Sequence, residues 1–384
     1  MTGENDTPLP QPERSDNDTQ ATATAVNPIG VIAIGRNEGE RLRLCLESVV
    51  GHVAQVVYVD SGSTDGSVEL AESLGVEVVD LDLSIPFTAA RARNEGFAWL
   101  QEIMPDVKYV QMIDGDCEVV EGWLETAVAF LDANPKFAVA CGRRRERFPD
   151  ATIYNKLTDM EWDTPIGMAK SCGGDALFRA KALREVGGYN PTVIAGEEPE
   201  MCVRLRQAGW TIERLDAEMT LHDAAMTKFS QWWKRNVRAG HAYAQGAAMH
   251  GKADGHNVKQ VRSNFVWAFV FGQWLNVTLS LLILLVNLLF VVWLEMPKIQ
   301  YAFICIVIVC LWIILTWLLT RLWLRIRDFR LSKDDQPSDA TLYATFTVLG
   351  KIPNAWGAIK YYERRFLGRK SEIIEYKTSG AVTA

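Results

Sequence analysis

The sequence predicts an α/β fold, with a mostly parallel sheet and helices on both of its faces, followed by a hairpin of two long apolar helices. Between residues 29 and 113, short apolar runs alternate with amphipathic segments, which indicates a succession of strands and helices. Residues 266–294 and 301–324 are two further apolar runs. Each is longer than the roughly 20 residues that a helix needs to span a bilayer.

The composition limits the possible classes of function. The chain has 384 residues and a net charge of -7, which argues against a general nucleic-acid binder, so we expect no nucleic-acid partner. Its seven cysteines form no Cys-X-X-Cys motif, which fits a reducing compartment. Residues 1–27 are polar and lack an apolar segment. We therefore expect a disordered tail there and no signal peptide.

The strands and helices of the first part follow in order. The first strand covers residues 29–34, and the next helix has apolar residues at the spacing of a buried face: Leu42, Cys45, Leu46 and Val49. Strands are expected at 55–59, 76–79, 109–113, 138–144 and 211–215, and helices at about 66–74 and 88–100. In such a sheet, ligands bind beyond the carboxyl ends of the strands. The residues that follow the strands are therefore the candidate site.

Two carboxylates, Asp114 and Asp116, follow the strand at 109–113, and Gly115 allows a tight turn between them. The two acids repel each other unless a cation lies between them, and oxygen ligands suit Mg²⁺ or Mn²⁺. For an isolated Asp-X-Asp tripeptide, a solvated turn is the commoner explanation. The prediction of a metal site therefore depends on the motifs around it.

Polar residues also follow the first two strands. Arg36, Asn37 and Glu38 come after the first strand, and Asp60 comes after the second. The Asp60 carboxylate can accept a hydrogen bond from the imide N–H of a pyrimidine, while Arg36 and Asn37 can hold a base, a ribose or a phosphate. These residues therefore predict a nucleotide pocket beside the metal.

The glycine-rich motifs of other nucleotide-binding proteins are missing from the sequence. It has neither Gly-X-Gly-X-X-Gly after the first strand nor a Gly-X-X-X-X-Gly-Lys-Ser/Thr motif, which argues against dinucleotide redox chemistry and against a P-loop enzyme. The phosphates are therefore expected on the metal and on basic side chains. Arg91 and Arg93 are the candidates.

Four motifs, in their order and spacing, resemble the family 2 glycosyltransferases of the GT-A fold. They are Val31-Ile32-Ala33-Ile34 with Arg36-Asn37-Glu38, the run from Val57 to Ser67, Ala92-Arg93-Asn94-Glu95-Gly96, and Asp114-Gly115-Asp116. The likeness covers roughly residues 28–225 and suggests a membrane-anchored bacterial member with a Rossmann-like GT-A domain. It implies an inverting enzyme that takes a sugar from a nucleoside diphosphate donor, with a divalent metal on the diphosphate. It further implies that Asp60 contacts the base and that Asp114 and Asp116 lie at the ribose and the metal.

The segment Gly173-Gly174-Asp175 matches a glycine-containing strand that the family has beside the donor sugar. Close approach of the backbone to a ligand would explain both glycines, and these three residues are the donor-sugar candidates. A structural bulge would explain the same glycines equally well.

Glu197 and Glu198 lie at the predicted start of a helix, because Pro199 suits the first helical position and Gly209 ends the pattern. An inverting transfer to a hydroxyl needs a base to take the acceptor proton. In the family, a Glu-Asp pair occupies this position and its second member is the base. We therefore predict Glu198 as the base, with Glu197 as the alternative. Simple capping of a surface helix is the other interpretation.

Two later segments complete the predicted site. His222 follows the strand at 211–215, and in related GT-A enzymes a late histidine near this point completes the metal site, so we expect His222 as a third metal ligand. Residues 145–170 have no clear period and are expected to form a loop over the site.

The last part of the sequence predicts contact with a membrane. Residues 228–245 are basic, aromatic and amphipathic, which suits a membrane interface or an anionic acceptor. Processive synthases of the family have Gln-X-X-Arg-Trp here, whereas this chain has Gln231-Trp232-Trp233-Lys234-Arg235, which favours transfer of a single sugar. Basic residues flank both apolar runs, so the positive-inside rule predicts a cytoplasmic catalytic domain on the inner (plasma) membrane. A basic helix at residues 360–366 is expected at the membrane surface.

We therefore expect five parts. They are a tail at 1–27, a glycosyltransferase domain at 28–230, an interfacial linker at 231–263, two transmembrane helices at 264–325, and a basic cytoplasmic tail at 326–384. The predicted activity is transfer of one sugar from a UDP- or GDP-sugar to a hydroxyl of a lipid-linked acceptor in envelope or exopolysaccharide synthesis. Two alternatives stay open: a polyprenyl-phosphate glycosyl synthase, and a non-catalytic scaffold that binds sugar nucleotides.

Overall fold

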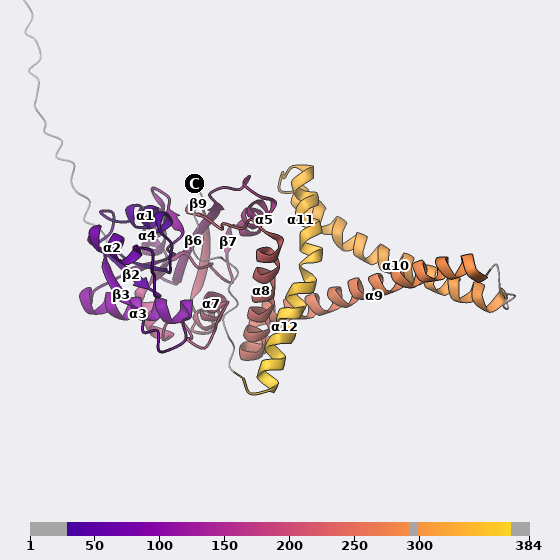
Figure 1. Ribbon diagram of the computed structural model, residues 1–384. Coiled ribbons are helices and arrows are strands. Elements are labelled where there is room, and N and C mark those ends of the chain that lie inside the picture. The colour runs from indigo at the N-terminus through magenta and orange to yellow at the C-terminus, as the bar shows by residue number, and fades with distance from the viewer. Residues whose placement is uncertain (1–28, 292–297, 370–384) are drawn as a thin grey trace, which may run out of the picture.

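The computed structural model describes residues 29–291 and 298–369. The expected disordered tail at 1–27, the end of the first apolar run and the last residues of the basic tail lie outside these residues. The described chain begins with a sheet domain, from which two long helices project (Figure 1).

The strands of the described chain form one sheet in the order β3-β2-β1-β4-β8-β6-β9-β5, with β7 paired to β9. Their bounds are β1 (Ile29–Gly35), β2 (Gln55–Asp60), β3 (Glu77–Asp80), β4 (Tyr109–Asp114), β5 (Cys117–Val119), β6 (Phe137–Glu146), β7 (Gly167–Met168), β8 (Ala176–Arg179) and β9 (Thr211–His222). The sheet is α/β, as the sequence predicts.

The sheet is mixed rather than mostly parallel. Strands β3, β2, β1 and β4 are parallel to one another. Strand β8, between β4 and β6, runs antiparallel to both of them. The reason is the path of the chain, because the Asp175 side chain, directly before β8, accepts a hydrogen bond from the backbone N–H of Asp114 at the carboxyl end of β4. Strand β8 therefore starts at the carboxyl edge and runs back through the sheet.

The helices of the sheet domain cover the sheet and are α1 (Glu40–Glu47), α2 (Ser67–Ser73), α3 (Ala89–Ile103), α4 (Trp123–Ala133), α5 (Ile153–Trp162), α6 (Ala180–Glu185) and α7 (Glu197–Gln207). The four apolar side chains predicted for the buried face of the first helix segment, Leu42, Cys45, Leu46 and Val49, are all fully buried. That spacing prediction is therefore confirmed.

Helix α5 corrects the expectation of a loop at residues 145–170. Thr152 caps the helix, because its hydroxyl accepts a hydrogen bond from the backbone N–H of Asn155 at 3.1 Å. Leu157 and Met160 then bury their side chains against the sheet domain. The cap at Thr152 and the apolar residues five and eight positions later are visible in the sequence. The helix has fewer than three turns, however, so its apolar pattern is too short to identify it.

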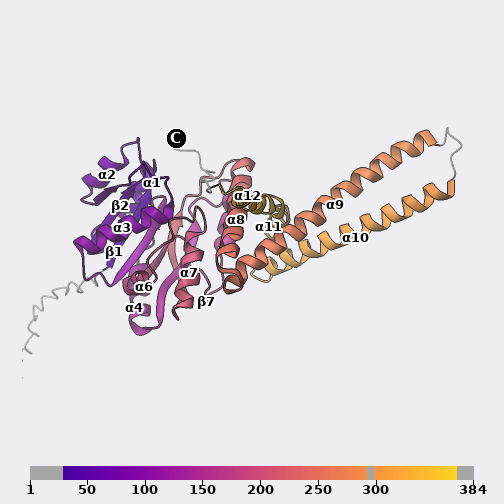
Figure 2. The same ribbon diagram turned by 90° about the horizontal axis from the view of Figure 1, so that it is seen from below.

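Six further elements follow the sheet domain: α8 (Phe229–His250), the short 3₁₀ helix η1 (Gly251–Asp254), α9 (Gly255–Val291), α10 (Lys298–Leu331), α11 (Pro337–Leu349) and α12 (Lys351–Phe366). Figures 1 and 2 show α8 and α12 side by side between the sheet domain and the projecting hairpin of α9 and α10. The basic stretch at 228–245 is thus a helix that contacts the sheet domain.

The apolar helices are long enough to cross a bilayer over Gly255–Val286 and Ala302–Leu331, and no residue in the most apolar window of either span is buried. Two hydrogen bonds join the helices, one from the Trp274 indole to Thr316 and one from the Trp312 indole to Thr278, both at 3.0 Å. These two tryptophans therefore link the hairpin as well as adding to its apolar surface.

The end of α10 is tied to α5. Lys333 Nζ lies 2.6 Å from a carboxylate oxygen of Asp163, directly after α5, and Arg330 Nη1 donates to the carbonyl of Met160 at 3.1 Å. Arg330 is buried. The hairpin is therefore fixed to the sheet domain by buried polar contacts as well as by chain connectivity.

Helices α8 and α12 cross with their backbones in contact. A Cβ added at Gly240 would lie 1.9 Å from the carbonyl oxygen of Asn354, and one at Gly357 would lie 2.0 Å from that of Val237. Such distances leave no room for a methyl group. The two glycines thus set the distance between the helices.

We expect Gly240→Ala to destabilise the protein by about 1–3 kcal/mol, because the methyl group would force the two backbones apart. The unfolding temperature of the purified protein measures the effect. Gly272→Ala on α9 is the matched control, since a Cβ there meets no described atom within 4 Å. Equal unfolding temperatures for the two variants would contradict the close crossing.

Candidate active site

The three strand-end motifs meet at one edge of the sheet. Gly35 in β1 is paired with Asp60 in β2, and Ile34 is paired with Asp114 in β4. This edge opens into a cavity of about 530 Å³. Among the predicted site residues, those that line the cavity are Arg36, Asn37, Glu38, Arg93, Asp114, Asp116 and Glu197.

The helices after the sheet domain also line the cavity, as does one residue of α5 in the sheet domain itself. Arg235, Arg238 and Tyr243 of α8 line it, together with Asn354 of α12 and Glu161 of α5. Arg235 forms an ion pair with Glu161 at 2.6 Å. The cavity is therefore bounded on one side by acids of the sheet edge and on the other by a helix that carries arginines.

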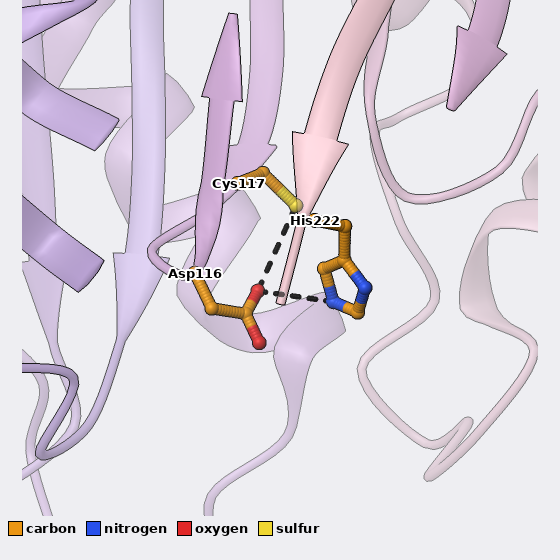
Figure 3. A group of neighbouring side chains, drawn as sticks. All are labelled: Asp116, Cys117 and His222. Atoms are coloured by element: carbon orange, nitrogen blue, oxygen red, sulfur yellow. Dashed lines mark hydrogen bonds and ion pairs between the residues drawn. The ribbon is translucent and has the colours of Figure 1, made fainter. Parts of the chain in front are cut away.

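Asp116 and His222 lie together, as the metal prediction requires. His222 Nε2 is 3.2 Å from Asp116 Oδ1, and Cys117 Sγ is 3.6 Å from the same oxygen (Figure 3). The ligand atoms of these three residues all lie within 4.8 Å of one another. Cys117 was not predicted, because a single cysteine after the Asp-X-Asp turn has no recognisable spacing.

The protonation states fit a divalent cation. Burial, and secondarily the charge of Arg144, lower the pKa of His222 to about 4, so its imidazole is neutral at pH 7 and can donate a lone pair. The buried Nδ1 of His222 has no hydrogen-bond partner among the described residues. Burial raises the pKa of the Cys117 thiol, which therefore stays protonated. A carboxylate and a neutral imidazole, with Asp114 close by, are a suitable donor set for Mg²⁺ or Mn²⁺.

Arg93 joins the two acidic parts of the site. Its Nη2 donates to Asp114 Oδ1 at 2.6 Å, and its Nη1 donates to Glu197 Oε1 at 2.7 Å. The guanidinium is buried, which by itself would lower its pKa, but the two carboxylates outweigh burial and raise it. Arg93 lines the cavity, but its Nη groups are engaged by protein carboxylates, and its role as a phosphate ligand stays a prediction.

Glu197 and Glu198 point to different surroundings. Helix α7 begins at Glu197, after Gly196 with φ of 76°, which is two residues earlier than Pro199 suggests. Glu197 lines the cavity, whereas Glu198 is 5% exposed and is not among the lining residues. The predicted first choice of base therefore lies behind the cavity wall, and the alternative lies on it.

The surroundings of Glu198 are a small buried cluster. Its Oε1 accepts a hydrogen bond from the backbone N–H of Cys172 at 2.5 Å and lies 3.1 and 3.0 Å from the thiols of Cys172 and Cys202. Burial raises the pKa of Glu198, and these hydrogen bonds oppose that rise. Its visible role is to fix the start of α7 to the segment before β8.

The segment Gly173-Gly174-Asp175 packs against charged side chains of the site. A Cβ on Gly174 would lie 3.1 Å from Arg93 Nη2 and 3.2 Å from Asp114 Oδ2. Gly173 has φ of 85°, which favours glycine. Asp175 is fully buried, and its Oδ2 accepts from Thr220 at 2.9 Å and pairs with Arg144 at 2.8 Å. The close approach is thus to Arg93 and Asp114, and contact with a donor sugar stays a prediction.

Asp60 and Asn37 shape the loops beside the cavity. The Asp60 carboxylate accepts hydrogen bonds from the Tyr58 hydroxyl and from the backbone N–H groups of Gly62 and Ser63. Asn37, with φ of 58°, joins the loop after β1 to the loop after β2, because its Oδ1 accepts from the N–H of Thr64 at 2.7 Å. Asp60 does not line the cavity, so its contact with a base remains untested.

The other predicted nucleotide ligands differ in their surroundings. Arg36 lies over the Phe87 ring at 5.9 Å, and Glu38 pairs with Arg41 at 2.8 Å, both at the cavity. Arg91 is different, because its guanidinium donates to backbone carbonyls of the segment 82–86, at 2.6 Å to that of Ile85. Arg91 is not among the residues that line the cavity, and it holds this loop in place.

Besides Cys117, two more residues of the site were missed in the sequence. Trp162, at the end of α5, stacks edge-on against His222, with ring centroids 4.6 Å apart. Arg144, in β6, lies over the Trp162 ring at 5.2 Å. Arg144 is one of three successive arginines in a strand, and only the alternation of the strand could have indicated which one points inward.

Known proteins resemble the part of the chain that forms the sheet domain. Residues 31–187 match the family model described as "Glycosyl transferase family 2". Glycosyltransferase AglE of Haloferax volcanii is 24% identical over 230 residues, which cover 56% of this chain and 73% of AglE. Pre-mycofactocin glycosyltransferase of Mycobacterium tuberculosis is 24% identical over 58% of this chain and 48% of its own length. Succinoglycan biosynthesis protein ExoA of Rhizobium meliloti is 28% identical over 42% of this chain and 52% of its own length. The chain spans about half the length of these last two relatives.

Two solved structures have a weak likeness to the chain. Mannosyltransferase PcManGT from Pyrobaculum calidifontis, in complex with GDP-Man and Mn²⁺, is 19% identical with a TM-score of 0.45, over 59% of this chain and 64% of that one. TarS 1–349 from S. aureus is 14% identical with a TM-score of 0.45, over 60% of this chain and 68% of that one. The assignment of the family depends on the sequence match instead.

The matched residues 31–187 contain β1 to β4, the Asp114-Gly115-Asp116 turn and β8, which are the parts that build the acidic side of the cavity. Residues 31–187 are therefore identified by the family model as a family 2 glycosyltransferase domain, and this domain is built on a mixed α/β sheet.

Proposed function

We propose that the chain is a membrane-bound, inverting enzyme that moves one sugar from a UDP- or GDP-sugar to a hydroxyl of a lipid-linked acceptor. The observation that carries this proposal is one cavity lined by Asp114, Asp116 and Glu197 on one side and by α8 on the other. The acceptor would belong to envelope or exopolysaccharide assembly. The name of the relative ExoA, a succinoglycan biosynthesis protein, supports such a role.

The proposed base is Glu197 rather than Glu198. Glu197 lines the cavity, and Glu198 is buried behind it against two thiols. Glu197 would take the proton of the acceptor hydroxyl as that hydroxyl attacks the anomeric carbon, while Arg93 holds the carboxylate in place. Glu198 would position α7, so that replacing it would disturb the site indirectly.

Asp116 and His222, with Asp114, would hold the divalent cation, Mg²⁺ or Mn²⁺. When bound, such a cation stabilises the negative charge that develops on the leaving diphosphate. The neutral imidazole of His222 and the buried position of Asp116 are the features of this chain that support the assignment.

The acceptor would enter from the side of α8. Arg235 and Arg238 line that wall, and guanidinium groups suit the phosphates of a lipid-linked acceptor. Helix α8 leads through η1 into α9, whose apolar surface is exposed. An acceptor anchored in a bilayer could therefore reach the cavity without leaving the membrane surface.

The proposed location is the inner membrane, with α9 and α10 as its two spans and the sheet domain in the cytoplasm. The exposed apolar surface of both helices supports this arrangement. Arg321 and Arg325 follow the most apolar part of α10, on the side of the sheet domain, in agreement with the positive-inside rule.

We expect Glu197→Gln to lower the turnover by about 10²–10⁴-fold, because the amide cannot accept the acceptor proton, with little loss of nucleotide-sugar binding. Glu198→Gln is the matched variant and should retain more turnover, since it lies outside the cavity lining. Turnover and donor binding of both purified variants decide the assignment. The opposite ranking would make Glu198 the base. Near-normal turnover of both would instead favour a phosphate acceptor, as in a polyprenyl-phosphate glycosyl synthase.

We expect removal of divalent cations with EDTA to abolish transfer, and Mn²⁺ or Mg²⁺ to restore it. Asp116→Asn should raise the cation concentration needed for half-maximal activity, because it removes a charged ligand. Asp106→Asn, at an exposed acid of the same domain, is the control. Full activity of the wild type in EDTA would rule out the metal.

We expect Cys310, an exposed thiol within α10, to resist a membrane-impermeant maleimide in intact membranes and to react after addition of detergent. A cysteine introduced by Asp106→Cys in the sheet domain should react in inside-out vesicles without detergent. Labelling of Cys310 in intact membranes would argue against the proposed span.

A further inference from the structure

Arg144 has more hydrogen-bonding capacity than its protein contacts use. Its Nε pairs with Asp175 at 2.8 Å, and its side chain is 14% exposed. Its Nη2 is buried and has no hydrogen-bond partner among the described residues. Buried donors in folded proteins nearly always have a partner, so this guanidinium needs an explanation beyond its single ion pair.

The neighbours of Arg144 hold it beside the proposed metal site. Its guanidinium lies over the ring of Trp162, which itself contacts His222. Its Nη2 lies 3.3 Å from the position that a Cβ on Gly173 would take, and 3.4 Å from that on Gly174. The same Gly174 position is 3.2 Å from Asp114 Oδ2. The two glycines thus let the Arg144 guanidinium lie close to the Asp-X-Asp turn.

The charges around this point favour an anion as the missing partner. Arg93, the other buried guanidinium here, already has two carboxylate partners, Asp114 and Glu197. Arg144 has one, Asp175, which is itself also bonded to Thr220. A guanidinium can donate charge-assisted hydrogen bonds to a phosphate, and Nη2 of Arg144 has no partner among the described residues.

We propose that Arg144 binds the β-phosphate of the nucleoside diphosphate donor, from the side of Gly173 and Gly174. This inference rests on the proposed function, since it needs a nucleoside diphosphate in the cavity. Arg144 is not among the residues that line the cavity, and Asp114, which lines it, is the neighbour of Gly174 that links the two. Asp175 and Trp162 orient the guanidinium, and Asp116 and His222 would hold the cation that stabilises the charge of the diphosphate. Arg144 is then the positive side chain that stays with the leaving group when the sugar departs.

The test compares nucleoside diphosphates with nucleoside monophosphates. Binding of UDP, UMP, GDP and GMP to the full chain is measured by calorimetry with Mg²⁺ present, for the wild type and for Arg144→Gln. For the nucleotide pair that the wild type prefers, the variant should bind the diphosphate about tenfold to a hundredfold more weakly and the monophosphate unchanged. Arg144→Lys, which keeps the charge but not the planar fork, should lie between them and serves if Arg144→Gln does not fold.

Arg145→Gln is the matched control, because Arg145 is the next residue of β6, is exposed and pairs with Glu218 at 2.7 Å. It should leave both affinities unchanged. Equal weakening of diphosphate and monophosphate, no weakening of either, or a change only in the KM for the complete nucleotide-sugar would overturn the inference. A wild type that binds no nucleotide would instead overturn the proposed function, whereas activity that depends on Glu197 but not on Arg144 would leave that function standing.

Discussion

The arrangement of the site depends on the buried guanidinium of Arg93. It joins Asp114 at the end of β4 to Glu197 at the start of α7, residues that are far apart in the sequence, with contacts of 2.6 and 2.7 Å. A buried charge that loses its partner typically costs about 3–5 kcal/mol. The Asp-X-Asp turn and the carboxylate proposed as base are therefore held at a fixed separation by one side chain, and the cavity forms around that contact.

The helices after the sheet domain take part in the same network. At the end of α10, Lys333 pairs with Asp163 and Arg330 donates to the carbonyl of Met160. Trp162, which lies between Met160 and Asp163 in the sequence, contacts His222. A chain of direct contacts thus leads from the end of the hairpin to the proposed metal site. Since α8 and α12 also line the cavity, the site is shared between the sheet domain and the helices that follow it.

The sequence predicted those features that depend on local pattern. The strands β1, β2 and β4, the buried face with Leu42 and Leu46, and the meeting of polar residues at one sheet edge follow from hydrophobic periodicity and from parallel pairing. The direction of single side chains could not be predicted. Glu197 and Glu198 are adjacent on a helix and so point about 100° apart, and the thiols of Cys172 and Cys202 decide which one faces the cavity.

The direction of the side chain also distinguishes Arg91 from Arg93, which lie two residues apart on α3. Arg93 is at the cavity, and Arg91 holds a loop. Two helical positions turn the side chains by about 200°, so Arg93 contacts Asp114 of the Asp-X-Asp turn while Arg91 reaches the carbonyls of the segment 82–86. The contacts of Arg91 are local, whereas those of Arg93 join Asp114 and Glu197, which only the folded sheet domain brings together. A motif can therefore name the residues of such a site, but their roles follow from the packing. In this chain that packing extends to α8, which lines the cavity, and to the end of α10, which contacts α5, so the helices after the sheet domain help to set the shape of the site.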